Sequence, residues 1–122
     1  MRRAALLLLL SLTACSRGYG RGELSPTEQA ALGDVLRAYL SAQETHYSRH
    51  NTYSSNLGEL GVTTDGATIR IISADARGHA AVVSHDDHDD AGCAVFVGNA
   101  SAPSTPGGRA ASEEGRIVCD TE

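Results

Sequence analysis

The sequence predicts an α+β fold in which one long N-terminal amphipathic helix packs on a small antiparallel sheet of about four strands. Apolar residues recur at helical spacing from Ser25 to about Arg49, which predicts the helix. After Ala67, short segments rich in β-branched residues alternate with turn residues, which predicts the strands. A chain of 122 residues leaves room for one domain with a modest core.

Residues 1–14 have the features of a secretory signal peptide. Arg2 and Arg3 give a positive start, and the apolar stretch from Ala4 to Leu10 is too short to span a bilayer. We therefore expect this segment to be removed, so that the mature chain begins at Cys15.

The segment Leu12-Thr13-Ala14-Cys15 resembles the lipobox of bacterial lipoproteins. The resemblance implies that Cys15 carries diacylglycerol and palmitate and anchors the chain in a membrane. In such lipoproteins an aspartate after the cysteine usually causes retention in the inner membrane. Ser16 therefore implies delivery to the outer membrane, facing the periplasm or the cell surface. The alternative is an ordinary signal peptide followed by an unrelated cysteine.

Residues 15–24 are expected to be the lipidated cysteine and a flexible tether, because glycines and arginines occur there without apolar periodicity. The globular domain is then expected over residues 25–122. Ser25 can cap its long helix, Pro26 suits the first helical position, and Glu28 completes a capping box. The residues predicted on the buried helical face are Leu32, Val35, Leu36, Tyr39, Leu40, Gln43 and Tyr47.

A short helical turn is predicted within residues 54–60, ending at Gly61, and the sheet follows it. The predicted strands are residues 67–72, 79–84, 93–97 and 117–119, with a turn at residues 75–78. In the third strand, Cys93, Val95 and Val97 are expected to alternate inward. Residues 98–115 are rich in Gly, Ser, Ala and Pro, so we expect them to form a surface loop.

The cysteine count predicts one disulfide. With Cys15 taken by lipid, Cys93 and Cys119 remain in an oxidising compartment, where thiols tend to pair. A reactive or metal-binding thiol pair is the alternative, but the two cysteines lack the close spacing of such sites.

The chain is acidic, which makes nucleic acid an unfavourable partner. Its formal net charge is -5, and two of its ten basic residues lie in the signal segment, so the mature chain is more acidic still.

Most of the mature chain, from about Leu36 to Asp120, resembles type IV pilins and pseudopilins. Paired aromatics near a helix end, a turn with tyrosine, a leucine-containing segment and a late cysteine-bounded strand pair carry the resemblance. These segments are Tyr39–Tyr47, Asn51–Tyr53, Leu57–Gly61, Cys93–Val97 and Val118–Asp120. The resemblance implies a pilin-like domain whose carboxyl-terminal loop is bounded by a disulfide.

One feature of pilins is missing from this chain. Pilins begin with a prepilin-peptidase site followed by about twenty apolar residues that pack in the fibre and the membrane. Here the apolar stretch precedes the expected cleavage before Cys15. The combination implies a pilin head on a lipid anchor, acting as a non-catalytic interaction or assembly module with protein partners. Type IV pilus or type II secretion machinery would supply those partners.

A cluster of imidazoles and carboxylates between the second and third predicted strands is a candidate metal site. Its residues are His85, Asp86, Asp87, His88, Asp89 and Asp90. Such side chains suit a divalent cation such as calcium, which some pseudopilins hold in a loop. The spacing matches no EF-hand, and a solvated hairpin tip is the alternative. The alternative function is therefore a divalent-metal-binding lipoprotein.

The remaining signals for chemistry are weak. His46 and His50 lie four residues apart on the predicted helix, but no glutamate follows the first histidine as a zincin motif requires. The chain has no Gly-x-Ser-x-Gly motif, no glycine-rich phosphate loop and no cysteine left for nucleophilic attack. We therefore expect neither an enzyme nor an organic cofactor.

Overall fold

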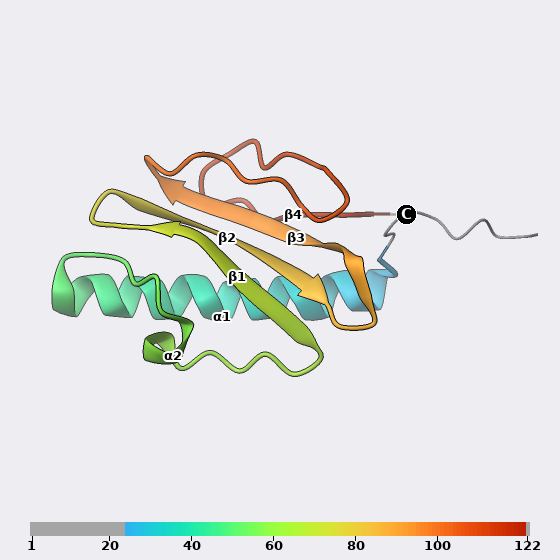
Figure 1. Ribbon diagram of the computed structural model, residues 1–122, viewed down its shortest axis with the longest axis horizontal. Helices are drawn as coiled ribbons and strands as arrows, with labels where there is room; N and C mark the ends of the chain where they lie inside the picture. The colour runs from blue at the N-terminus through green and yellow to red at the C-terminus, as the bar shows by residue number, and fades with distance from the viewer. Residues whose placement is uncertain (1–23, 122) are drawn as a thin grey trace, which may run out of the picture.

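A single long helix, α1 (Pro26–His50), lies along one face of a four-stranded antiparallel sheet (Figure 1). The computed structural model describes residues 24–121, so the predicted signal segment and the predicted lipid attachment at Cys15 lie outside the described residues. A short helix follows α1, and the strands neighbour one another in chain order. These elements are α2 (Leu57–Leu60), β1 (Ala67–Ala74), β2 (Gly78–His85), β3 (His88–Gly98) and β4 (Val118–Cys119). The predicted α+β class is confirmed.

The start of α1 is fixed by local hydrogen bonds. The Glu28 amide donates to Ser25 Oγ at 3.2 Å, and the Ser25 amide donates to Glu28 Oε1 at 3.1 Å, which is a complete capping box. Pro26 occupies the first turn, where no intrahelical partner for its nitrogen is needed. The helix ends at His50 because Asn51 takes a left-handed conformation, with φ of 57°. The predicted helix is thus confirmed to within one residue of its expected end.

The predicted apolar face of α1 packs on the sheet. Leu32, Leu36, Tyr39 and Gln43 are buried, whereas Tyr47 is only half-buried. From the sheet, the main core cluster receives the side chains of Ala67, Ile69, Ala81, Val83, Ala91, Cys93 and Val95. Because this core holds few large side chains, it depends on close packing of small aliphatic ones.

Leu24 differs from the prediction that it belongs to a flexible tether. Its side chain is fully buried in the main core cluster, and its backbone forms a parallel bridge with Thr121. The described chain therefore begins with a residue anchored in the fold, ahead of α1. Burial of a leucine stabilises a domain by about 1.5–3 kcal/mol, so Leu24 contributes to the stability of the fold although it precedes the helix cap.

The hairpin between β2 and β3 is tighter than expected. The prediction treated residues 85–90 as a connection, but β2 extends to His85 and β3 begins at His88. Only Asp86 and Asp87 remain in the turn, and the register shifts between Ser84 and His85. Two-residue turns match the twist of antiparallel strands, so strand pairing extends into this acidic segment.

The alternation predicted for the third strand is incomplete because β3 is buried on both faces. Cys93 and Val95 lie in the main core as expected, but Ala94 is also fully buried and Val97 is only half-buried. The covering segment, residues 99–117, is drawn in orange to red and lies against β3 and β4 on the side away from α1 (Figure 1). Pro106 of this segment lies beside Gly92 of β3. A Cβ atom added to Gly92 would lie 3.0 Å from Pro106 Cγ.

Residues 98–115 were expected to form a surface loop, and this expectation is wrong in part. Pro103, Thr105 and Ala111 within it are buried, and a backbone bridge joins Ser104 to Ala110.

Smaller differences concern the ends of the predicted helices and strands. The second helix is limited to Leu57–Leu60, and the last strand excludes residue 117. Among the described residues, no helix is both long and apolar enough to cross a membrane.

Candidate functional site

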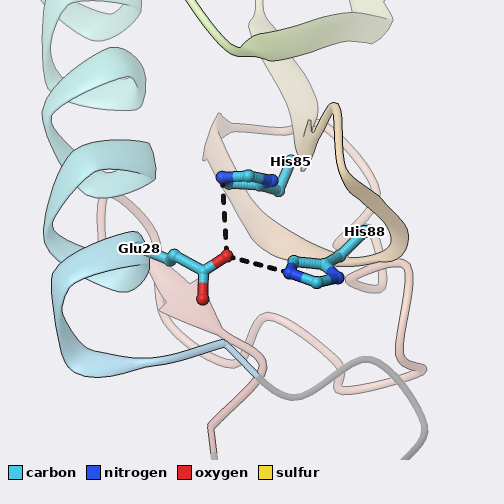
Figure 2. Close-up of side chains that lie close together, drawn as sticks. All are labelled: Glu28, His85 and His88. Atoms are coloured by element: carbon cyan, nitrogen blue, oxygen red, sulfur yellow. Dashed lines mark ion pairs between the residues drawn. The ribbon is translucent and has the colours of Figure 1, made fainter. Parts of the chain in front are cut away.

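Glu28, His85 and His88 meet at the point where the β2–β3 hairpin approaches the first turn of α1 (Figure 2). Glu28 Oε2 lies 3.4 Å from His85 Nε2 and 3.2 Å from His88 Nε2. The two imidazole rings lie 5.2 Å apart between centroids. Within residues 24–121, these are the only three His, Cys, Asp or Glu side chains whose ligand atoms lie within 4.8 Å of one another.

Local structure positions each of these three side chains. His85 and His88 face each other across the two-residue turn, so their side chains leave the hairpin on the same side. Glu28 is held by the capping box through Oε1, which leaves Oε2 directed at the histidines. Hydrogen bonds with Ser25 keep the pKa of Glu28 below its usual value. Partial burial opposes this effect, and electrostatic interaction with His88 and His85 lowers the pKa of Glu28 further.

The four aspartates of the predicted metal site do not join this group of ligand atoms. Asp86 Oδ1 accepts a hydrogen bond from the Thr68 hydroxyl at 2.8 Å. The Asp87 amide donates to His85 Nδ1 at 3.1 Å. The structure therefore brings together two of the six predicted residues and adds Glu28. The sequence singled out Glu28 only as a helix-capping acid, and no local pattern links it to the hairpin.

His46 and His50 stack on each other at the other end of α1, with ring centroids 4.4 Å apart. His46 Nδ1 lies 2.8 Å from the Thr52 carbonyl oxygen and therefore donates to it, while Nε2 lies 3.5 Å from Glu59 Oε2. Among the described residues, however, His46, His50 and Glu59 do not bring three ligand atoms within 4.8 Å of one another. Its contacts tie the end of α1 to the turn that follows.

A buried polar network joins α1 to β2. Tyr39 Oη lies 2.8 Å from His79 Nδ1 and accepts from Gln43 Nε2 at 3.2 Å. The Gln43 amide also pairs with the backbone of Ser54, donating to its oxygen at 2.7 Å and accepting from its nitrogen at 2.8 Å. Burial raises the pKa of Tyr39 to about 12, against the opposite effect of the Gln43 hydrogen bond. His79 Nε2 is buried and has no hydrogen-bond partner among the described residues.

His79 should make the protein less stable as the pH falls. Burial lowers its pKa from 6.5 to about 4, so between these values the unfolded chain binds a proton that the folded chain excludes. The contribution of His79 is complete above pH 6.5 and falls by about 3 kcal/mol on acidification to pH 4. Urea unfolding of the full chain at pH 7.0, 5.5 and 4.0 measures this loss.

The His79→Phe variant isolates the effect because it keeps a planar ring and cannot bind a proton. Its free energy of unfolding should fall less steeply with acidification than that of the natural protein. Parallel pH profiles for the two proteins would show that His79 does not cause the acid sensitivity.

A disulfide and a buried carboxylate hold the carboxyl-terminal segment against the sheet. The predicted Cys93–Cys119 bridge is confirmed, and it joins paired residues of β3 and β4 with Cα atoms 4.0 Å apart. Asp120 Oδ2 accepts from the amides of Gly92 and Gly107, each at 2.9 Å, and Oδ1 accepts from the Thr105 hydroxyl at 2.6 Å. Asp120 therefore links β3, the covering segment and the end of β4 at one point.

Comparison with known proteins assigns no function to these residues. No protein-family model matches the chain, and no curated protein matches it.

Proposed function

We propose that the chain is a lipid-anchored, pilin-like lipoprotein that acts as a non-catalytic interaction or assembly module, accessory to type IV pilus or type II secretion machinery. The observation that carries the proposal is the arrangement of α1, the sheet and the covering segment 99–117. A long helix lies on one face of an antiparallel sheet, and a disulfide-bounded segment lies over the other side (Figure 1). The resemblance to pilins implies a long helix on a small antiparallel sheet and a disulfide-bounded carboxyl-terminal loop, so this arrangement supports the proposal.

The covering segment has the properties of a presented binding surface. Its backbone is held by the disulfide, by Asp120 and by the Arg109 side chain, which donates to the Cys119 oxygen at 3.1 Å and to Thr121 Oγ1 at 3.0 Å. Its exposed side chains include Ser101 and Ser112. A preorganised loop loses little conformational freedom on binding, which favours recognition of a protein partner.

The proposed anchor would keep this surface close to a membrane. Leu24 bridges Thr121, so the point where the tether enters the domain lies beside the end of the described chain. The nine residue steps from Cys15 to Leu24 can span at most about 30 Å when fully extended. A partner that is itself embedded in or attached to the membrane would therefore be within reach.

Photocrosslinking in cells tests the proposal. A photoreactive amino acid at Ser101 or Ser112 lies on the covering segment, and one at Ala38 lies on the exposed side of α1. We expect both loop positions to yield the same discrete adduct with a pilus or secretion component, and Ala38 to yield none. Equal adducts from Ala38, or no adduct from either loop position, would contradict the proposed surface.

The Cys15→Ser variant tests the anchor in the same cells. It should no longer incorporate a labelled fatty acid and should leave the membrane fraction, because the described residues offer no helix that could hold it there. Crosslinks from the loop positions to a membrane partner should also become weaker in this variant. Continued labelling, or unchanged membrane retention, would show that Cys15 is not the anchor.

A further inference from the structure

We propose that Glu28, His85 and His88 form a binding site for a transition-metal dication of the Zn²⁺ class. The three side chains come from two separate elements, the first turn of α1 and the β2–β3 hairpin, and converge on one point (Figure 2). Two imidazoles and one carboxylate are a ligand set that proteins use for zinc and related metals. The site adds metal binding to the proposed interaction module and is independent of that module's partner.

The spacing of the ligand atoms suits a tetrahedral ion. With metal–ligand bonds near 2.05 Å, two ligands of a tetrahedral zinc lie about 3.3 Å apart. Glu28 Oε2 lies 3.4 Å from His85 Nε2 and 3.2 Å from His88 Nε2, so two edges of the tetrahedron already have the required length. One ring nitrogen of each histidine and a carboxylate oxygen of Glu28 all lie within 4.8 Å of one another. Rotation of the His88 side chain, which is 50% exposed, would close the third edge.

The nature and exposure of the ligands select the metal and its coordination. Calcium and magnesium prefer sites made of oxygen ligands, whereas nitrogen supplies two of the three donors here. The side chains of Glu28 and His85 are 24% and 21% exposed, so the site is partly shielded but open to solvent. A water molecule would therefore complete the coordination sphere.

The surroundings favour a cation. The hairpin carries four carboxylates, which raise the local concentration of positive ions; they are Asp86, Asp87, Asp89 and Asp90. The capping box fixes the Glu28 carboxylate before any ion arrives. One hydrogen bond must change when a metal binds. In the structure, His85 Nδ1 accepts a hydrogen bond from the Asp87 amide. If His85 binds the metal through Nε2, its ring proton moves to Nδ1, which can then no longer accept that bond. That hydrogen bond is exposed, and water can replace it.

Calorimetric titration of the untagged full chain in mild detergent with ZnCl₂ tests the site. We expect one ion per chain with a micromolar dissociation constant, and Co²⁺ in its place should give the visible absorption bands of tetrahedral coordination. The variants Glu28→Gln, His85→Gln and His88→Gln should each weaken binding by more than about tenfold, since even the loss of an outer-shell partner costs this much. Glu28→Gln is informative because glutamine preserves the capping box while removing the carboxylate.

His50→Gln is the matched control. It removes an exposed histidine from the other pair on α1, so zinc affinity should be unchanged. Thermal melts without metal should show that the three site variants remain folded. The proposal is overturned if the natural protein binds no zinc in the micromolar range, or if His88→Gln binds as tightly as the natural protein. In that case the cluster is an ion pair that joins the hairpin to α1.

Discussion

Reduction of the Cys93–Cys119 disulfide is expected to lower the melting temperature of the protein by more than about 10 °C. The bridge closes a loop with a sequence separation of 26 residues. In the chain-entropy model, closing a loop of this length stabilises the folded state by about 3 kcal/mol. For a domain near a hundred residues, each kilocalorie corresponds to roughly 4–8 °C in melting temperature.

The effect should be concentrated at the carboxyl-terminal end of the fold. Strand β4 consists of Val118 and Cys119 alone, and its pairing with β3 is limited to those two positions. In contrast, α1 is capped at both ends and packs on the sheet through a separate set of contacts. Reduction at low temperature should therefore release the covering segment 99–117 while leaving the helix in place.

Thermal melts with and without reductant, followed by far-ultraviolet circular dichroism, measure this effect. The double variant Cys93→Ala/Cys119→Ala serves as the control, since reductant should not change its melt. Mass spectrometry of the oxidised protein should find no free thiol at either position. Two free thiols, or a melt that reductant leaves unchanged, would contradict the prediction.

Asp120→Ala is expected to destabilise the protein by about 3 kcal/mol or more. The carboxylate accepts three hydrogen bonds, and its residue is only 7% exposed. Truncation leaves the buried amide of Gly92 without an acceptor, and an unsatisfied buried donor costs about 1–3 kcal/mol. The partly buried amide of Gly107 also loses its acceptor and adds a smaller cost. The Thr105 hydroxyl can rotate to a new partner, so its loss contributes least.

Urea unfolding of the variant measures the change against Asp34→Ala. Asp34 is an exposed aspartate on α1 that pairs with Arg37, so its removal should change the free energy of unfolding by less than about 0.5 kcal/mol. Asp120→Asn should fall between the two, because an amide oxygen in the place of Oδ2 can still accept from the amides of Gly92 and Gly107. Equal effects of the alanine substitutions at 34 and 120 would show that the buried carboxylate does not hold the covering segment.

The effects of disulfide reduction and of Asp120→Ala on stability should also depend on each other. Asp120 adjoins Cys119 and acts on the same segment, and sites that share partners are not additive in stability. Once the disulfide is removed, Asp120→Ala should cost less than it does in the oxidised protein.

The sequence by itself determined the elements whose signals are local. Ser25, Pro26 and Glu28 lie within one turn, so the start of α1 could be predicted from neighbouring residues. The β-branched residues of the segment 67–72 likewise predicted a strand, and the structure forms β1 over Ala67–Ala74. The disulfide followed from the cysteine count, because only two cysteines remained once Cys15 was assigned to lipid.

Only the tertiary structure decided which distant residues meet. Periodicity records which face of an element is apolar, but it does not record which element packs on it. The burial of both faces of β3 depends on where the covering segment lies, and the burial of Leu24 depends on its bridge to Thr121. Glu28 joins His85 and His88 because packing of α1 on the sheet brings a helix start to a hairpin turn. Asp120 reaches Gly92, 28 residues away, for the same reason. These contacts are set by packing between elements, on which local sequence patterns carry no information.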